Sequence, residues 1–462
     1  MIRIDVLPDD VLLETFDFYM VLSTSSGYGE TAIEEWQLLV HVCRRWRYLV
    51  FGSPRRLNLR LLCTLERPTK DTLDIWPALP LVVDSEGIMD LSLNTDNITT
   101  ALGQNNRVCK VKLRLGNRQL EEVLAAMRVS FPELIRIHLV LDKGTPPVIP
   151  DSFLGGSAPR LRNFELEGIP FPGLPKLLLS ATHLVELSLL NVPHSGYISP
   201  KAMVALLSAL SSLKELALGF ESLQSRPDRE IRSLPPPIRS ILPALREFYF
   251  AGVTEYLEEF VTRIDAPQLV EMHMKFYNQI GFDGQRLAEF IHQTPTLRAH
   301  NEAYVQFGDY YASIELRSWP KVLEIGTLYV EPDLQLLFLS QVHNSPLPPP
   351  STVENLYIRR DFGCLEPVWK NDIIEKTQWS QLLLPFTAVK NLYLTNEFAP
   401  LVGAALQDLI GDKMVEVLPN LENIFVERLE PFQENFGQFV ARRQLSDHPI
   451  AISVCTRATF WD

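Results

Sequence analysis

The sequence predicts an α/β protein built from repeated units and preceded by a short helical segment. Three observations lead to this fold class. An apolar L-x-x-L-x-L motif recurs along most of the 462 residues, helical patterns lie between its copies, and residues 4 to 53 carry two amphipathic patterns instead. A chain of this length is also too long for one compact core, so several domains or an elongated repeat array are expected.

The motif recurs at a nearly regular spacing. In its first seven copies, successive start positions differ by 23 to 32 residues, which overlaps the period of about 20 to 29 residues typical of leucine-rich repeats. In such repeats the L-x-L part is a short strand whose apolar side chains point into the core, and the residues between them point to the concave face. The ten copies begin at Val108, Leu134, Leu161, Leu184, Leu213, Leu245, Leu269, Val353, Val389 and Leu421.

The segments between the strands favour helices. Leu120, Val123 and Met127, for example, follow helical spacing. Proline-containing turns such as Phe131-Pro132 come just before many strands, and proline ends a helix because it fixes the backbone and restricts the residue before it. The alternation of strand and helix implies parallel pairing with right-handed crossovers, and therefore a horseshoe solenoid with parallel strands.

The repeats are irregular. The asparagine or cysteine that usually closes the strand motif is missing from its expected place, because Asn191 falls one residue early and Asn117 one residue late. Residues 297 to 340 keep apolar alternation without a clean motif, so their register is left open.

The same patterns divide the chain into three predicted parts. They are residues 1 to 53, a connecting segment with the first repeat at 54 to 106, and an irregular leucine-rich-repeat-like solenoid at 107 to 462. A helix near Phe436 to Gln444 and a last strand near Ile450 to Val454 are expected to cap the solenoid.

The N-terminal segment has the pattern of two amphipathic helices. The first begins at Leu7-Pro8-Asp9-Asp10, where proline is tolerated and negative charge suits the helix dipole. The second has apolar residues at helical spacing from Trp36 to Val50, with arginines on its other side. About fifty residues cannot build a large core, so part of this apolar surface is expected to serve a neighbour or a partner.

The two halves, LPDDVLLETF and WQLLVHVCRRWRYLVFGSP, resemble an F-box, whose signature is a leading Leu-Pro, an acidic helix start and a later Val-Cys-(Lys/Arg)-x-Trp. With its repeats, the chain resembles the F-box and leucine-rich-repeat proteins abundant in mushroom-forming fungi. The resemblance implies a subunit of an SCF-type ubiquitin ligase, in which the F-box binds a Skp-type adaptor linked to a cullin and the solenoid recruits a target protein. It places these residues at the adaptor interface: Leu7, Pro8, Val11, Leu12, Phe16, Val42, Cys43 and Trp46.

An alternative is a repeat scaffold or inhibitor whose N-terminal helices only cap the solenoid. A face of Leu7 and Leu12 buried within the N-terminal unit would favour this alternative. Leu49 and Val50 are expected to pack internally, and Cys43 is expected to be a buried helix residue.

The strand residues between the apolar positions predict a target-binding face. This face begins basic at Lys110 and Lys112 and turns acidic at Glu165 and Glu167. Its later strands are mixed and aromatic, and tyrosine and arginine are the residue types that dominate protein-binding hot spots. The candidate target-binding residues are Tyr249, His273, Lys275, Tyr357, Arg359 and Tyr393.

No sequence pattern indicates catalysis, a cofactor or a metal. The usual nucleotide, hydrolase and zinc-ligand motifs are missing, so we expect a non-catalytic protein. The formal net charge of -13 disfavours nucleic acid as a partner. There is no signal-peptide pattern and no run of about 18 apolar residues, so we expect no membrane partner. Five scattered cysteines are typical of reduced thiols, which predicts a cytoplasmic or nuclear protein.

Overall fold

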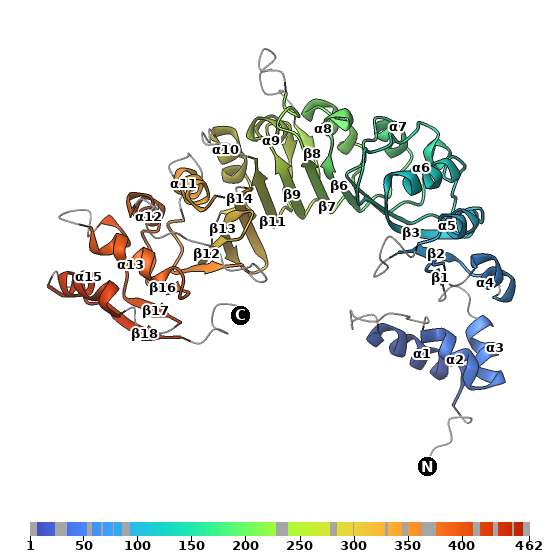
Figure 1. Ribbon diagram of the computed structural model, residues 1–462, viewed down its shortest axis with the longest axis horizontal. Coiled ribbons are helices and arrows are strands. Elements are labelled where there is room, and N and C mark those ends of the chain that lie inside the picture. The colour runs from blue at the N-terminus through green and yellow to red at the C-terminus, as the bar shows by residue number, and fades with distance from the viewer. Residues whose placement is uncertain are drawn as a thin grey trace. The chain divides into compact units, whose positions relative to one another are not determined.

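A computed structural model describes most of the chain (Figure 1). The chain divides into two compact units, Met1–Gly196 and Tyr197–Asp462, which we call the first and second units and describe separately. The described residues are 7–23, 35–52, 58–65, 68–76, 78–85, 93–227, 239–277, 284–298, 300–328, 331–343, 350–361, 376–409, 416–427, 433–445 and 448–455.

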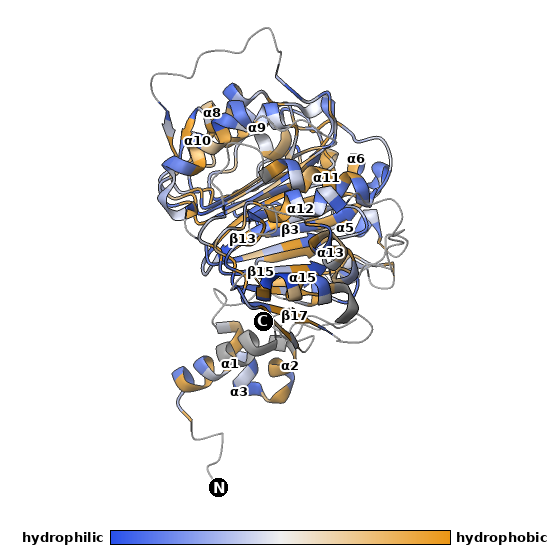
Figure 2. Ribbon diagram, turned by 90° about the vertical axis from the view of Figure 1, so that its left-hand side faces the viewer, coloured by the Kyte–Doolittle hydropathy of each residue, from blue (hydrophilic) through white to orange (hydrophobic). Residues whose placement is uncertain are grey.

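The first unit begins with three helices, α1 (Asp9–Ser23), α2 (Glu35–Val42) and α3 (Arg44–Gly52), which we call the helical segment. The single second helix expected from the sequence is therefore two helices. They are separated at Cys43, whose Sγ accepts a hydrogen bond from the backbone N–H of Trp46 at 3.5 Å. Cys43 is exposed and acts as the N-cap of α3, so its expected position as a buried helix residue was wrong. Figure 2 shows both hydrophobic and hydrophilic residues on α1 and α3.

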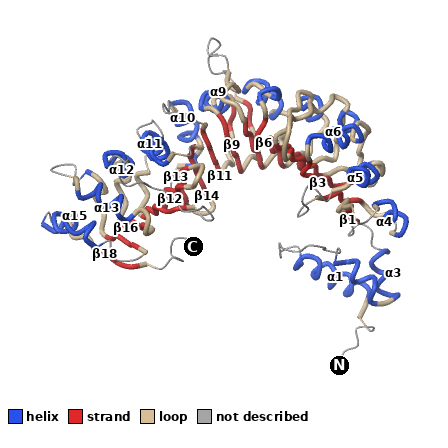
Figure 3. Tube along the Cα trace, in the orientation of Figure 1, coloured by secondary structure: helices blue, strands red, loops and turns tan. Residues whose placement is uncertain are grey.

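Six strands of the first unit form a sheet in the order β1 to β6, and the pairs from β1 through β6 are parallel. Short helices connect them, as the repeat pattern predicts (Figure 3). The strands are β1 (Leu59–Leu61), β2 (Leu81–Asp84), β3 (Val108–Leu115), β4 (Arg136–Leu141), β5 (Asn163–Glu167) and β6 (Glu186–Val192). The helices are α4 (Thr69–Ile75), α5 (Thr95–Leu102), α6 (Asn117–Ala126) and α7 (Leu174–Leu178).

The second unit continues the alternation of strands and helices. Its main strands are β7 (Glu215–Phe220), β9 (Glu247–Gly252), β11 (Glu271–Phe276), β12 (Glu302–Phe307), β13 (Ala312–Ser318), β14 (Lys321–Thr327), β15 (Asn355–Arg360), β16 (Asn391–Leu394), β17 (Asn423–Val426) and β18 (Ala451–Val454). Two short strands, β8 (Ser240–Ile241) and β10 (Ile264–Asp265), pair separately. The helices are α8 (Pro200–Leu207), α9 (Thr254–Val261), α10 (Gln285–Gln293), α11 (Pro332–His343), α12 (Lys376–Leu383), α13 (Ala399–Gln407) and α15 (Gln433–Leu445).

One part of the second unit departs from the predicted parallel solenoid. The strand order is β7-β9-β11-β14-β13-β12-β15-β16-β17-β18, and β13 pairs antiparallel with both β12 and β14. These three strands form a meander because only short turns connect them, and a short turn can join antiparallel strands but not parallel ones. The expectation of parallel strands throughout is therefore wrong for residues 302 to 327. It holds for the other main strand pairs of the unit.

Local sequence signals explain where the repeats turn. The turn before many of the strands closes a backbone hydrogen bond, as between the N–H of Leu134 and the C=O of Phe131 at 3.2 Å. The same bond recurs before β9, from Leu245 to Leu242, and this agrees with the expected proline turns. Helix α8 begins after Ser199, whose hydroxyl accepts a hydrogen bond from Ala202 N–H.

The sheet of the second unit has two different faces. In β9, Phe248 and Phe250 are fully buried beneath the helices, while Glu247 and Tyr249 alternate with them on the other side. We call the side opposite the helices the open face. The helix and the last strand that the sequence predicts near this end of the chain are present as α15 and β18. Within the described residues, no helix is long and apolar enough to cross a membrane.

Candidate functional site

The starts of α1 and α3 lie side by side in the helical segment. Arg45 of α3 reaches back to the start of α1, where its Nη2 donates a hydrogen bond to the backbone oxygen of Leu7 at 2.5 Å. The same guanidinium binds Asp9 Oδ1 through Nη2 at 2.6 Å and Nε at 3.1 Å. Arg45 therefore fixes the Leu-Pro start of α1 beside the start of α3.

The eight residues expected at the adaptor interface divide into an interior and an exterior group. Leu12 and Phe16 are 1% and 4% exposed, and the Phe16 ring packs on Trp46 with centroids 4.7 Å apart. These two are therefore core residues of the helical segment, which corrects their placement on a docking surface. The other residues keep exposed or partly exposed side chains: Leu7, Pro8, Val11, Val42, Cys43 and Trp46.

Exposed apolar side chains remain on the helical segment. Val11 is 40% exposed and Val42 is 59% exposed, although most of the chain's large apolar side chains are buried. Leu49 and Val50 are buried, as expected for residues that pack internally. The helical segment thus has a core of its own and also presents apolar groups to solvent.

The open side of the first sheet carries charges that neutralise each other. Arg136 of β4 contacts Glu165 of β5 at 2.6 Å and Glu186 of β6 at 3.9 Å. His138 lies 3.7 Å from Glu165, and burial lowers its pKa. The predicted change from basic to acidic strands is present here. These basic and acidic side chains largely form ion pairs with one another within the sheet.

On the open face of the second unit, side chains from successive strands align in rows. The row that we call the middle row passes through the meander, because β14, β13 and β12 each contribute one residue to it. In strand order, the middle row consists of Tyr249, His273, Glu324, Glu315, Tyr304, Tyr357, Tyr393 and Phe425.

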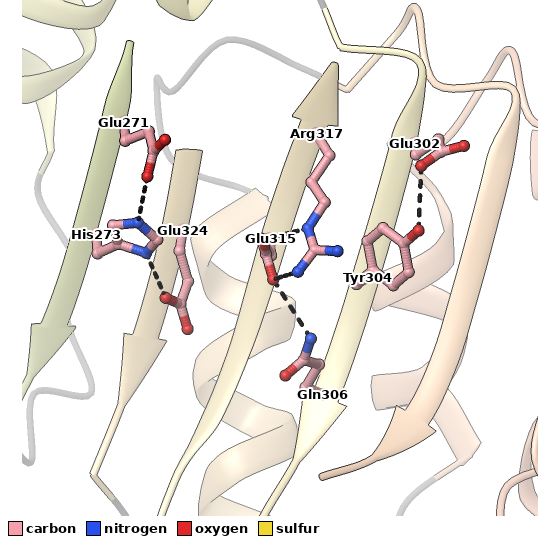
Figure 4. Close-up of polar contacts among 8 residues, drawn as sticks. All are labelled: Glu271, His273, Glu302, Tyr304, Gln306, Glu315, Arg317 and Glu324. Carbon is pink, nitrogen blue, oxygen red and sulfur yellow. Dashed lines mark hydrogen bonds and ion pairs between the residues drawn. The ribbon is translucent and has the colours of Figure 1, made fainter. Parts of the chain in front are cut away.

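Two carboxylates face each other at the centre of the middle row. Glu324 and Glu315 are in register on β14 and β13, and a basic group holds each from the outer side (Figure 4). His273 Nδ1 lies 2.8 Å from Glu324 Oε2, and Arg317 forms a two-bond ion pair with Glu315, one bond of which measures 3.0 Å. Because like charges directly opposite repel, these two partners make the carboxylate pair tolerable.

The ion pair of His273 and Glu324 changes the pKa of both groups. The hydrogen bond to Glu324 raises the pKa of His273, against the opposing effect of burial. Burial alone would raise the pKa of Glu324, but the hydrogen bond with His273 and the charge of Lys275 lower it below its ordinary value. Both shifts favour the charged forms of His273 and Glu324.

The other half of the middle row is a stack of aromatic rings. Tyr304 and Tyr357 lie 4.6 Å apart, Tyr357 and Tyr393 lie 4.4 Å apart, and Tyr393 and Phe425 lie 4.6 Å apart, all within 11° of parallel. We call these four residues the aromatic ladder. Arg317 and Arg359 lie over the Tyr304 ring, with guanidinium carbons 4.5 and 4.6 Å from its centroid.

An asparagine ladder runs beside the aromatic ladder. Asn391 Nδ2 donates to Asn355 Oδ1 at 2.8 Å, and Asn423 Nδ2 donates to Asn391 Oδ1 at 2.9 Å. These residues open β15, β16 and β17, so they are not the consensus asparagine that the sequence was found to lack. Together the two ladders fix the register of these strands.

The six candidate target-binding residues all lie on this open face. Tyr249, His273, Lys275 and Tyr393 are partly exposed. Tyr357 and Arg359 are only 9% and 6% exposed, because neighbouring aromatic rings cover them. The expectation that these two side chains are available to a partner is therefore wrong. Sequence reasoning missed Tyr304, Glu315, Arg317 and Glu324, which come from the meander. The signal available in the sequence was the alternation of charged and aromatic residues with apolar ones in residues 302 to 324.

The described residues of the two units show no constellation for metal chemistry. Among the described residues, no group of three His, Cys, Asp or Glu side chains could hold a metal ion. Cys63 and Cys109 are buried, and burial raises the pKa of both thiols, to about 12 for Cys63. These thiols are therefore in the unreactive protonated form at neutral pH.

The fold and this site define an α/β repeat protein with a mostly parallel sheet and a charged, aromatic open face. No family model matches the sequence, and no curated protein matches it. Among solved structures, the chain is similar to the leucine-rich repeat-containing protein LegL7 from Legionella pneumophila, with 12% identity over 84% of this chain and 98% of that chain. The TM-score is 0.28, so the fold is described from the strands and helices of this chain and not from that similarity.

Proposed function

We propose that this protein is a non-catalytic substrate-recognition subunit of an SCF-type ubiquitin ligase, acting in the cytoplasm or nucleus. In this proposal the helical segment binds a Skp-type adaptor and, through it, a cullin. The open face of the second unit binds a target protein. Ubiquitin transfer would be performed by other subunits, and this chain would contribute by holding the target close to them.

The observation that carries the proposal is the contact of Arg45 with Leu7 and Asp9. It joins the two separated halves of the F-box-like sequence at one place. Near this contact in the sequence, Pro8, Val11 and Val42 are exposed rather than packed inside. Exposed apolar groups on a small, ordered helical segment favour a protein partner.

A specific observation also favours the alternative of a repeat scaffold with a helical cap. Leu12 and Phe16 are buried within the helical segment, so part of the F-box-like pattern is explained by its internal packing. In this second candidate function the open face still binds a protein, but no ubiquitin ligase is assembled.

An adaptor-binding experiment separates these two functions. Full-length protein would be tested by pull-down and calorimetry with a purified Skp-type adaptor, beside the double variant Val11→Asp, Val42→Asp. Val129→Asp is the matched control, because Val129 is 51% exposed and lies on the repeats, far in sequence from the helical segment. Circular dichroism would confirm that all three proteins are folded.

The proposal expects binding by the wild type and the control, and at least a tenfold loss in the double variant. Equal binding by all three proteins would contradict the assigned docking surface. If the folded wild type does not bind the adaptor, the repeat scaffold is the better account.

A further inference from the structure

Strand β18 lies at one end of the sheet of the second unit (Figure 1). It pairs in parallel with β17, and the backbone N–H of Ala451 donates a hydrogen bond to the backbone oxygen of Glu422 at 2.9 Å. Successive residues of a strand direct their backbone groups to opposite edges, so the N–H and C=O groups of Ile452 and Val454 point away from β17. Among the described residues, no strand pairs with this outer edge.

Apolar side chains are also uncovered at this end of the sheet. Ile452 and Val454 are in register with Ile424 and Val426 of β17. The two β17 residues are 0% and 1% exposed, whereas Val454 is 53% exposed and Ile452 is partly exposed. The apolar layer of the sheet therefore extends onto β18 without being closed there.

The outer edge of β18 lacks the features that keep sheet edges apart. Edge strands of monomeric proteins usually carry a charged residue, a proline or a bulge that obstructs a further strand. Residues 451 to 455 read Ala-Ile-Ser-Val-Cys, without charge or proline, and they pair with β17 without a register shift. Isoleucine and valine also favour strands. Such an edge is a template for another strand.

The strand that fits this edge best is β18 itself. In an antiparallel pair with a two-fold axis at Ser453, Ile452 lies opposite Val454 of the second copy, and Val454 lies opposite Ile452 of the second copy. Both are outward-facing positions, and opposite residues of this kind exchange two hydrogen bonds. The pairing therefore satisfies the outward N–H and C=O groups of Ile452 and Val454 in both copies.

The side chains match in the same register. Ile452 and Val454 lie on the helix side of the sheet, so each β-branched apolar side chain meets another one across the pair. Ser453 is exposed on the opposite side and faces its own counterpart. A two-fold interface requires such self-complementarity, because the same surface serves both copies.

We propose that this protein forms a two-fold symmetric dimer in which the outer edges of two β18 strands pair antiparallel. The pairing continues the sheet of the second unit from one copy into the other. The dimer does not depend on the proposed function, because neither the helical segment nor the middle row takes part in the pairing.

Sedimentation of the full-length protein over a hundredfold range of concentration tests the dimer. The binding variant is Val454→Lys, because a lysine there would place its charge against Ile452 of the second copy. Val129→Lys is the matched control, since Val129 is 51% exposed and Val454 is 53% exposed. Circular dichroism would confirm that both variants are folded.

We expect a reversible monomer–dimer equilibrium in the wild type and the control, and a dissociation constant at least tenfold higher for Val454→Lys. A wild type that stays monomeric at every concentration would overturn the proposal. Equal self-association of all three proteins, or growth into larger assemblies, would overturn it as well.

A disulfide tests the register. At the two-fold axis, the Cα atoms of residue 453 in the two copies would be about 4.5 Å apart, within the range that a disulfide spans. Ser453→Cys should therefore form a disulfide between the introduced cysteines under mild oxidation. Cys455 lies opposite Ala451 of the second copy in this register, so the wild type should not be linked through Cys455. A dimer linked through Cys455, or one in which Ser453→Cys forms no link, would overturn the antiparallel pairing.

Discussion

Tyr357 and Tyr304 stack 4.6 Å apart with their rings within 8° of parallel, although 53 residues separate them in the sequence. Tyr357 also stacks on Tyr393 at 4.4 Å, so it is a central ring of the aromatic ladder. Its position joins the antiparallel meander to the parallel strands that follow it.

We predict that Tyr357→Ala lowers the free energy of unfolding by about 3 kcal/mol, because a buried ring and two stacked contacts are lost. Tyr357→Phe keeps the ring and should cost less than about 1 kcal/mol. Urea unfolding, with hydrogen exchange measured over residues 355 to 360, would test both values. Equal destabilisation by the two variants would show that the hydroxyl, and not the stack, is important.

Leu12 and Val11 are neighbours in sequence with opposite roles. Leu12→Ala should destabilise the helical segment by about 2 to 5 kcal/mol, because Leu12 is almost fully buried. Val11→Ala should change stability by no more than about 0.5 kcal/mol and should weaken adaptor binding. Hydrogen exchange over residues 9 to 52 measures the first effect, and adaptor titration measures the second. The assignment fails if Val11→Ala unfolds the segment.

The contact between Arg45 and Asp9 predicts a measurable coupling. Both side chains are partly exposed, at 37% and 60%, so the ion pair itself should contribute less than about 1 kcal/mol to stability. Arg45→Gln should nevertheless weaken adaptor binding several-fold, because it releases the backbone of Leu7. A double-mutant cycle of Arg45→Gln with Asp9→Asn, measured on adaptor affinity and on stability, tests this. Additive effects on affinity would show that the two residues act independently.

The pair of His273 and Glu324 predicts a pH-dependent stability. The raised pKa of His273 gives a contribution that is fully present below its unfolded pKa of about 6.5 and is lost as pH rises through the higher folded value. The lowered pKa of Glu324 gives a contribution that is present above its unfolded pKa and is lost as pH falls through the lower folded value. Glu324→Gln should therefore reduce the melting temperature more at pH 6 than at pH 9.

The matched control for this prediction is the double variant His273→Gln, Glu324→Gln. At pH 9 it should be about as stable as Glu324→Gln, because the contribution of protonated His273 is lost as pH rises. Tyr249, Glu271, Lys275 and Glu315 surround the pair and are unchanged in all variants. A loss from Glu324→Gln that does not vary with pH would contradict the charged pair.

The sequence predicts most of the repeat architecture because each repeat carries its own signal. The apolar positions that start at Leu134 and Leu245 become the strands β4 and β9, with turns closed where proline lies. The helix and the last strand expected near residues 436 to 454 are also found where the pattern places them. These features depend on local spacing, which one sequence displays directly.

The meander and the ladders are beyond such reasoning. Residues 302 to 327 show the alternation of apolar and polar residues that any strand can show. This pattern does not indicate which strand each one pairs with, or whether the pairing is parallel or antiparallel. The letters Asn-Leu-Tyr recur at 355 and 391, but their stacking is visible only once the two strands are in register. For Leu12 and Phe16, an amphipathic helix pattern identifies an apolar face and leaves open whether its own segment or a partner covers that face.

The antiparallel meander has a consequence for how this chain acquires its structure. Parallel pairs such as β15 with β16 join residues 36 positions apart, whereas β13 and β14 meet after a two-residue turn. Closing a short loop costs less chain entropy and is faster than bringing distant segments together. In a repeat array, where growth can begin at many places, residues 302 to 327 are therefore the expected folding nucleus of the second unit, from which neighbouring repeats extend in both directions.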